Sequence, residues 1–132
     1  MKQFIYPYVM FKDSKKAAEY YISVFGGEVT YTMLGKDTPN CPEELLESVM
    51  HLQYKLNGYE FYFADANLED NGRIHLHLDF ENLDEMKTAF NNMSIEGKVV
   101  QELDETFWGA VFGNIIDKFN VTWQFHYSLP QN

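Results

Sequence analysis

The chain has 132 residues, of which 45% are hydrophobic and 17% aromatic, a composition typical of one well-filled globular domain rather than a disordered segment. Its formal net charge of −10 at pH 7 disfavours binding to phosphate backbones or anionic lipid, so neither nucleic acid nor membrane is expected as a partner. The single cysteine, Cys41, cannot form an internal disulfide, no apolar run reaches membrane-spanning length, and the first residues lack a signal-sequence pattern. These features predict a cytoplasmic protein.

The first half of the chain predicts a strand, a helix and three further strands. The first strand is expected over residues 4–11 and the helix over residues 14–25, with Asp13 as its N-cap. Turn signals end the helix at Gly26-Gly27 and join the last two strands at Asn57-Gly58. The three strands after the helix are expected over residues 28–34, 48–56 and 59–66.

The second half, after a polar linker at residues 67–72, predicts the same order. A strand over residues 73–80 is followed by Asn82, with Glu85 three residues later as a capping-box-like helix start. The apolar positions of this helix have helical spacing: Leu83, Met86, Phe90 and Met93. Three strands then follow over residues 97–103, 110–116 and 121–127. Two βαβββ modules, residues 4–66 and 73–128, are therefore predicted within one α+β domain spanning residues 1–132.

The predicted strands have two different faces. In residues 73–80, the polar residues His75, His77 and Asp79 alternate with the apolar residues Ile74, Leu76, Leu78 and Phe80. In the last strand, Gln124 and His126 alternate in the same way with Trp123 and Phe125. One face is expected to be buried against a helix, and the other to offer polar groups to a ligand.

Three segments carry a resemblance to a known family: DSKKAAEYYISVFGGEV, SVMHLQYKLNG and ETFWGAVFGNIIDKFNVTWQF. With the doubled βαβββ plan, they are similar to the vicinal oxygen chelate superfamily of glyoxalase I, bleomycin-resistance proteins and extradiol dioxygenases, and most of all to its PhnB-like members. The resemblance covers nearly the whole chain. It implies a glyoxalase/bleomycin-resistance-like fold, in which two curled sheets cup a site and helices pack on the convex side, and it implies a homodimer. Asn120 stands where the family usually has glycine, and asparagine also tolerates a left-handed turn.

The resemblance also implies four positions for a divalent metal, which polarises substrate oxygens in metal-dependent members. In this chain they fall on Tyr6, one of residues 61–63, His75 and Gln124, a set with one strong ligand. A tight divalent site normally needs at least three protein donors, so neither a metal nor another cofactor is expected. An alternative ligand set consists of the four histidines: His51, His75, His77 and His126.

The main functional hypothesis is a small-molecule binding protein without a tightly bound metal. The residues expected to line its cup are Tyr6, Tyr8, His51, His75, His77, Gln124 and His126. One alternative is a metal-dependent lyase, isomerase or dioxygenase of the glyoxalase type, and another is a dimeric module whose own side chains fill the cup. No residue is assigned a catalytic role, and the ligand stays open. Phe107 and Trp108 are interpreted as core or rim packing, and residues 35–47 as a long loop whose role as a lid stays open.

Overall fold

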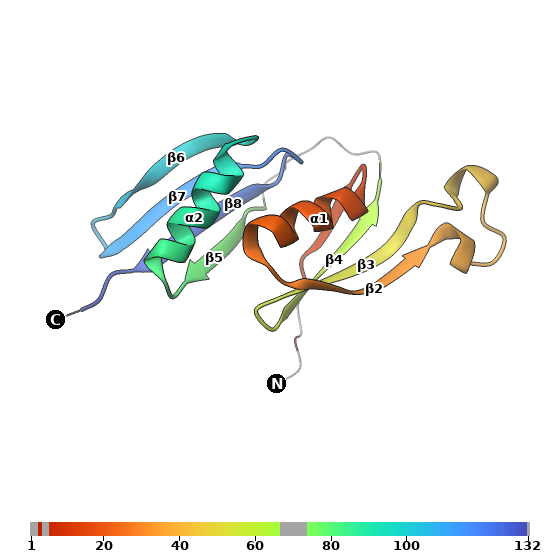
Figure 1. The fold of residues 1–132 in the computed structure, drawn as a ribbon, viewed down its shortest axis with the longest axis horizontal. Coiled ribbons are helices and arrows are strands. Elements are labelled where there is room, and N and C mark those ends of the chain that lie inside the picture. Colours follow the sequence, from red (N-terminus) through yellow and green to blue (C-terminus); the bar gives the residue numbers. More distant parts are fainter. Residues whose placement is uncertain (1–2, 4–5, 67–73, 132) are drawn as a thin grey trace. The chain divides into compact units, whose positions relative to one another are not determined.

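The computed structural model describes residues 3, 6–66 and 74–131, so the predicted linker and the start of the predicted first strand at residues 4–5 lie outside the described residues. The chain divides into two compact units, Met1–Leu68 and Glu69–Asn132. Each unit contains one α-helix and one four-stranded sheet (Figure 1). The described helices include none that is long and apolar enough to cross a membrane.

Unit 1 folds as the first predicted module. Its elements are β1 (Tyr8–Phe11), α1 (Ser14–Phe25), β2 (Glu28–Leu34), β3 (Val49–Leu56) and β4 (Tyr59–Asp65). The strand order across the sheet is β1-β4-β3-β2, with β1 parallel to β4 and the other neighbours antiparallel. The long connection between β2 and β3 contains two short 3₁₀ turns, Gly35–Asp37 and Glu43–Leu45.

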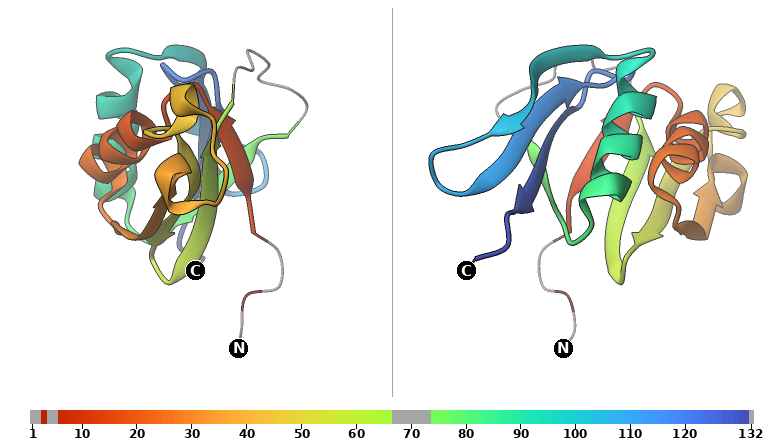
Figure 2. Two further views of the ribbon diagram at one scale, coloured as in Figure 1. Left: turned by 90° about the vertical axis from the view of Figure 1, so that its right-hand side faces the viewer. Right: turned by 60° about the vertical axis from the view of Figure 1, so that its left-hand side comes forward.

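Unit 2 repeats this plan strand for strand. Its elements are β5 (Leu76–Phe80), α2 (Leu83–Ser94), β6 (Lys98–Glu105), β7 (Ala110–Ile116) and β8 (Thr122–Ser128). The strand order β5-β8-β7-β6, with β5 parallel to β8, matches that of unit 1. In each unit the helix lies against one face of its own sheet, and neither sheet closes into a barrel (Figure 2). The predicted α+β fold of two βαβββ modules is confirmed.

Local signals fix the ends of the helices and the hairpin turn as predicted. The side chain of Asp13 accepts a hydrogen bond from the Lys16 amide at 3.1 Å, and that of Asn82 accepts one from the Glu85 amide at 2.9 Å. Asn57 and Gly58 both have positive φ angles, 51° and 85°, which is the backbone of a two-residue hairpin turn.

Both cores form on the helix side of the sheets. In unit 1, the ring of Tyr21 from α1 packs against Phe11 and Phe63 with centroids 6.0 and 5.9 Å apart. In unit 2, Phe90 from α2 packs edge-on against Phe125 at 5.2 Å. Because side chains alternate along a strand, burial of this set leaves the intervening residues on the opposite face, called here the helix-free face.

The first strand of each unit is shorter than predicted. In unit 1, Pro7 has no N–H for a sheet ladder, although its carbonyl accepts from the Tyr62 amide at 2.8 Å, and β1 begins only at Tyr8. In unit 2, β5 begins only at Leu76, which pairs with Trp123 of β8. The prediction that Ile74 meets a helix is therefore wrong, since this side chain is 79% exposed.

Backbone hydrogen bonds join the two ends of the connection between β2 and β3. The Gly35 amide donates to the Ser48 carbonyl and the Lys36 amide to the Leu46 carbonyl, both at 2.9 Å. A Cβ at Gly35 would overlap the carbonyl oxygen of Leu45, so the two ends of the loop touch where only glycine fits. The corresponding connection in unit 2 spans only residues 106–109, which makes the long loop an insertion specific to unit 1.

Candidate functional site

On the helix-free face of unit 2, three of the predicted residues form a hydrogen-bonded network of His75, Gln124 and His77. The His77 Nδ1 lies 2.9 Å from the Gln124 Oε1, and the Gln124 Nε2 lies 3.3 Å from the His75 Nδ1. Since an amide oxygen only accepts and an amide nitrogen only donates, His77 carries its proton on Nδ1 and His75 accepts on Nδ1. In the neutral rings, the outer nitrogen, Nε2, is therefore an acceptor on His77 and a donor on His75.

The fourth predicted residue of unit 2, His126, is held from both sides. Its Nδ1 donates to the Asp79 Oδ1 at 3.0 Å, and its Nε2 accepts from the Trp108 Nε1 at 3.4 Å. The imidazole is only 17% exposed, whereas the carboxylate of Asp79 is 70% exposed. Its ring also lies 5.4 Å from that of His77, so His126 continues the polar surface of the network.

Of the predicted core or rim packing for Phe107 and Trp108, only the core part is wrong, since the Trp108 ring packs against that of Phe112 with centroids 6.1 Å apart. Phe107 is 98% exposed and Trp108 is 52% exposed, so neither is core. They stand at the turn between β6 and β7, where Gly109 has a φ of 82° and the chain reverses. Trp108 contributes instead through its indole N–H to His126.

On the helix-free face of unit 1, aromatic rings replace the network. Tyr6 stacks on Tyr62 with centroids 4.5 Å apart and an interplanar angle of 8°. The Tyr8 hydroxyl lies 3.0 Å from the His51 Nδ1, and both rings meet Tyr62 edge-on. Tyr31 of β2 extends the group, 6.2 Å from His51. This set of five rings is called the tyrosine cluster: Tyr6, Tyr8, Tyr31, His51 and Tyr62.

Tyr62 is the central ring of this cluster. Desolvation raises the pKa of Tyr62 above its usual range, with smaller contributions from the adjacent Tyr6 and from the carboxylate of Glu60. The phenol therefore stays protonated and neutral at physiological pH. Glu60 lies two residues before Tyr62 on the same strand and hence on the same face, and its carboxylate accepts from Gln53 at 3.4 Å and Thr30 at 3.5 Å.

The strand registers show which residues of the two units occupy corresponding positions. Tyr8 pairs with Tyr62 in unit 1 as His77 pairs with Gln124 in unit 2, and Tyr8 and His77 precede their N-caps, Asp13 and Asn82, by the same number of residues. The position that the sequence left among residues 61–63 is thus Tyr62. Tyr6 is adjacent to Tyr62, and the corresponding His75 is adjacent to Gln124.

The residues at these four positions do not fit a divalent metal centre. Two are neutral phenols, and Gln124 is a neutral amide whose oxygen already accepts from His77. The Nδ1 lone pair of His75 accepts from the same amide. Across the part of the chain that the structure describes, no three side chains of His, Cys, Asp or Glu are grouped as metal ligands would be, and this holds for His75, His77 and His126 within unit 2.

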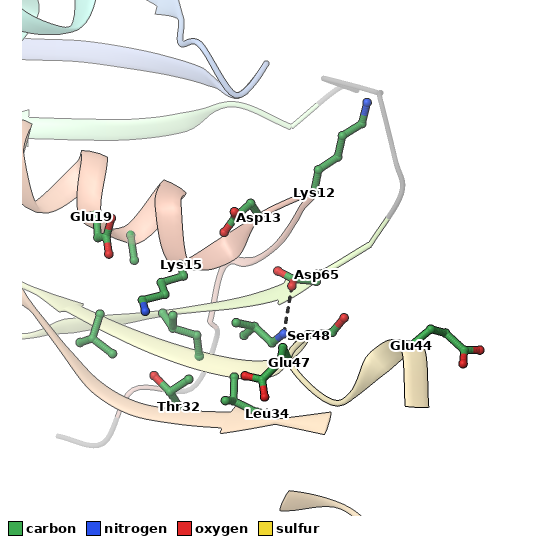
Figure 3. A pocket seen from close by; sticks show the side chains of 14 residues that line it. Lys12, Asp13, Lys15, Glu19, Thr32, Leu34, Glu44, Glu47, Ser48 and Asp65 are labelled. Carbon is green, nitrogen blue, oxygen red and sulfur yellow. Dashed lines mark hydrogen bonds between the residues drawn. The ribbon is translucent and has the colours of Figure 1, made fainter. Parts of the chain in front are cut away.

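A hollow of about 720 Å³ lies elsewhere in unit 1, on the helix side of the sheet (Figure 3). It opens because α1 packs mainly on β1, β3 and β4, which leaves space between the helix and the edge strand β2. Its lining includes Lys15, Glu19, Thr32, Leu34 and Glu47, and none of the seven predicted site residues. Its exposed lysine and glutamate side chains are of mixed charge and select no particular ligand chemistry.

Sequence reasoning placed Asp79 on the polar face of its strand but did not count it among the site residues. It missed three contributors to the two faces: Trp108, Tyr31 and Glu60. Glu60 had a usable signal, since it alternates with Tyr62 on the same strand. Trp108 and Tyr31 had none, because they meet His126 and His51 only through the pairing of strands.

Comparisons with known proteins agree with this architecture. The Escherichia coli (strain K12) protein YjdN is 28% identical, with the alignment covering 89% of this chain and 90% of YjdN. Two solved structures are each 24% identical: protein PA1353 from Pseudomonas aeruginosa, with a TM-score of 0.86 over 98% of this chain and 100% of that one, and a PhnB protein from Bacillus cereus, with 0.79 over 96% and 100%. The fosfomycin resistance protein FosX from Listeria monocytogenes, 12% identical, has a TM-score of 0.70 over 97% and 94%.

The structural neighbours are at most 24% identical to this chain, so they establish only the fold. The family is established by a family model that matches both βαβββ modules. Residues 3–126 match the family model described as 3-demethylubiquinone-9 3-methyltransferase. The chain therefore belongs to that family, and it shares its fold with the PhnB protein and with FosX.

Proposed function

We propose that this protein binds a small organic molecule on the helix-free faces of its sheets, without a tightly bound metal. The observation that carries the proposal is the network of His75, Gln124 and His77. Gln124 fixes both imidazoles through Nδ1, so that their outer nitrogens offer one donor and one acceptor at set positions. Such a pair suits a ligand with adjacent hydroxyl and carbonyl groups, or an amide.

The same network supports a metal-free site. For His75 to bind a metal, it would have to give up the hydrogen bond from Gln124 or move its proton from the outer nitrogen. For the Gln124 oxygen to bind, the hydrogen bond from His77 would be lost. Each of these hydrogen bonds contributes about 1 kcal/mol to the stability of the network. One imidazole and one neutral amide bind a divalent ion too weakly to hold it tightly once those bonds are lost.

The test is elemental analysis of untagged protein purified without chelator, together with thermal melts. Melts are recorded with Zn²⁺, Ni²⁺, Mn²⁺ and Fe²⁺ and with a library of neutral and charged metabolites, for the wild type and His75→Ala. We expect no stoichiometric metal, and at least one metabolite that raises Tm in the wild type but not in the variant. Glu102→Ala on the exposed strand β6 is the control and should respond like the wild type.

The contrary outcome is equally specific. A stoichiometric metal, with a metal-dependent rise in Tm that disappears in His75→Ala, would contradict the proposal. It would favour the alternative of a metal-dependent lyase, isomerase or dioxygenase of the glyoxalase type, and would direct activity assays to those reactions.

We further propose that the protein is a cytoplasmic homodimer. The edge strands β2 and β6 each have one side without a partner strand in their own sheet, which leaves backbone donors and acceptors for another chain. Light scattering of the purified protein should give twice the chain mass of 15.5 kDa, and a monomer mass would contradict the dimer. Fractionation of cells producing the untagged protein should recover it with cytoplasmic markers, consistent with one unpaired cysteine.

A further inference from the structure

We propose that the tyrosine cluster of unit 1 is a binding site for a small organic cation, such as an alkylated ammonium group. This rests on the proposed binding function and names the class of ligand that unit 1 takes. The cluster gathers four phenol rings and one imidazole on one face, two of them well exposed: Tyr8 at 47% and Tyr31 at 49%. The π faces of tyrosine rings attract cations within about 6 Å of the ring centre.

The arrangement of the rings suits a compact cation. Tyr6 and Tyr62 stack and form one wall, while Tyr8 meets Tyr62 at an angle of 81° with centroids 5.6 Å apart and forms a second wall. The Tyr8 hydroxyl is tied to His51, which fixes the angle between these walls. An ammonium group carrying methyl groups can contact both ring surfaces at once, whereas a flat neutral molecule gains from only one.

The charge on this face also favours a cation. The Glu60 carboxylate lies on the same face as Tyr62, and its hydrogen bonds come from the uncharged groups of Gln53 and Thr30. Lys55 is opposite Glu60 in the strand register, yet the ion pairs among the described residues do not include these two. Within the described residues, a bound cation would therefore meet a carboxylate without an ion-pair partner, in a protein of net charge −10.

The internal duplication shows that the βαβββ fold does not require these rings. The positions in unit 2 that correspond to Tyr6, Tyr8 and Tyr62 are His75, His77 and Gln124, and they support the same strand pairing with polar side chains. The packing of the module is therefore satisfied without a stack of tyrosines. A group of rings that the fold does not need lies beside a carboxylate that has no ion pair with another described residue, and this combination points to a ligand.

The experiment uses choline and its neutral isostere 3,3-dimethylbutan-1-ol, which differ in charge but hardly in shape. Both are titrated into the full-length protein, and the ring signals of the tyrosines and histidines are followed by NMR. We expect choline to bind about 5- to 30-fold more tightly than the isostere, the range given by cation–π contacts. Tyr62→Leu and Glu60→Gln should each remove most of that preference, and Lys55→Gln should strengthen choline binding.

Tyr59→Leu is the matched control, because Tyr59 is on the same strand but 65% exposed and outside the cluster. It should bind choline like the wild type. Equal affinity for the two probes, or no binding of either, would overturn the proposal, and Glu60→Gln decides the matter even where Tyr62→Leu fails to fold. Failure of the broader binding function is distinguishable, because it is read from metabolite-dependent melts that respond to His75→Ala in unit 2.

Discussion

The carboxylate of Asp117 organises the turn between β7 and β8 and is only 4% exposed. Its Oδ1 accepts from the amides of Phe119 and Val121 at 2.8 and 3.1 Å, and its Oδ2 accepts from the Trp123 Nε1 at 2.7 Å. One side chain thus satisfies the turn backbone and the buried indole together, because a buried N–H without a partner is costly. The sequence predicted the turn at residues 117–120 but gave no sign that Asp117 is buried.

Removal of this carboxylate should destabilise the protein strongly. Asp117→Ala leaves three donors without their partner, and we expect a loss of about 2–4 kcal/mol in the free energy of unfolding. Asp117→Asn keeps one acceptor oxygen and should lose less. Urea unfolding monitored by tryptophan fluorescence measures both. A loss below about 0.5 kcal/mol for the alanine variant would show that water replaces these hydrogen bonds.

The end of helix α1 is fixed by a contact with strand β3. Gly26, with a φ of 84°, closes the helix, and its carbonyl accepts from the buried Tyr54 hydroxyl at 2.6 Å. The next residue, Gly27, packs tightly against the same side chain. A Cβ at Gly27 would lie 2.9 Å from the Tyr54 ring and 2.5 Å from the Lys55 carbonyl oxygen. The two glycines predicted the helix end, whereas the tyrosine that holds it comes from a strand far along the chain.

This contact predicts a change in stability at alkaline pH. Burial raises the pKa of Tyr54 far above its usual range. A tyrosine in the unfolded chain loses its proton near pH 10, so above that pH the unfolded state binds fewer protons than the folded state, and the free energy of unfolding falls as pH rises. Below pH 10 the contribution of Tyr54 is fully present.

Tyr54→Phe removes the titrating group and its hydrogen bond. At pH 8 we expect a loss of about 1 kcal/mol, and between pH 10 and 11 a shallower fall in stability than in the wild type. Urea unfolding at several pH values measures both, with Tyr59→Phe as the exposed control. Parallel pH curves for the wild type and Tyr54→Phe would mean that the Tyr54 hydroxyl ionises freely in the folded protein.

At the scale of the whole molecule, the chain is one structural plan used twice. Phe63 in unit 1 and Phe125 in unit 2 occupy corresponding positions, next to Tyr62 and Gln124, and are 1% and 0% exposed. Each packs against its own helix, with Tyr21 of α1 and Phe90 of α2 as the partner rings. The cores agree between the units, while the helix-free faces differ in chemistry.

The duplication predicts matched costs for matched substitutions. Phe63→Ala and Phe125→Ala should each destabilise the unit that contains them by about 3–5 kcal/mol, through lost burial and a cavity. Hydrogen exchange should locate the loss of amide protection in the sheet that carries each substitution. A cost below about 1 kcal/mol for either variant would show that this core collapses around the missing ring.

The sequence by itself determined the elements and their order. The signals that determine them act within a few residues: capping residues at 13 and 82, glycine and asparagine at the turns, and alternating polarity along the strands. The doubled βαβββ plan and the faces of the strands can therefore be predicted without a structure. The seven residues proposed for ligand binding came from the same alternation and from the resemblance, and they stay a prediction.

Only the tertiary structure decided which polar groups meet. The parallel pairing of β5 with β8 brings His75 and His77 to the two ends of one glutamine, and the corresponding pairing of β1 with β4 stacks Tyr6 on Tyr62. These contacts join residues more than forty positions apart in the sequence. Side-chain periodicity assigns a residue to a face, but the register of strand pairing decides its neighbour, and that register is set by the packing of the whole unit.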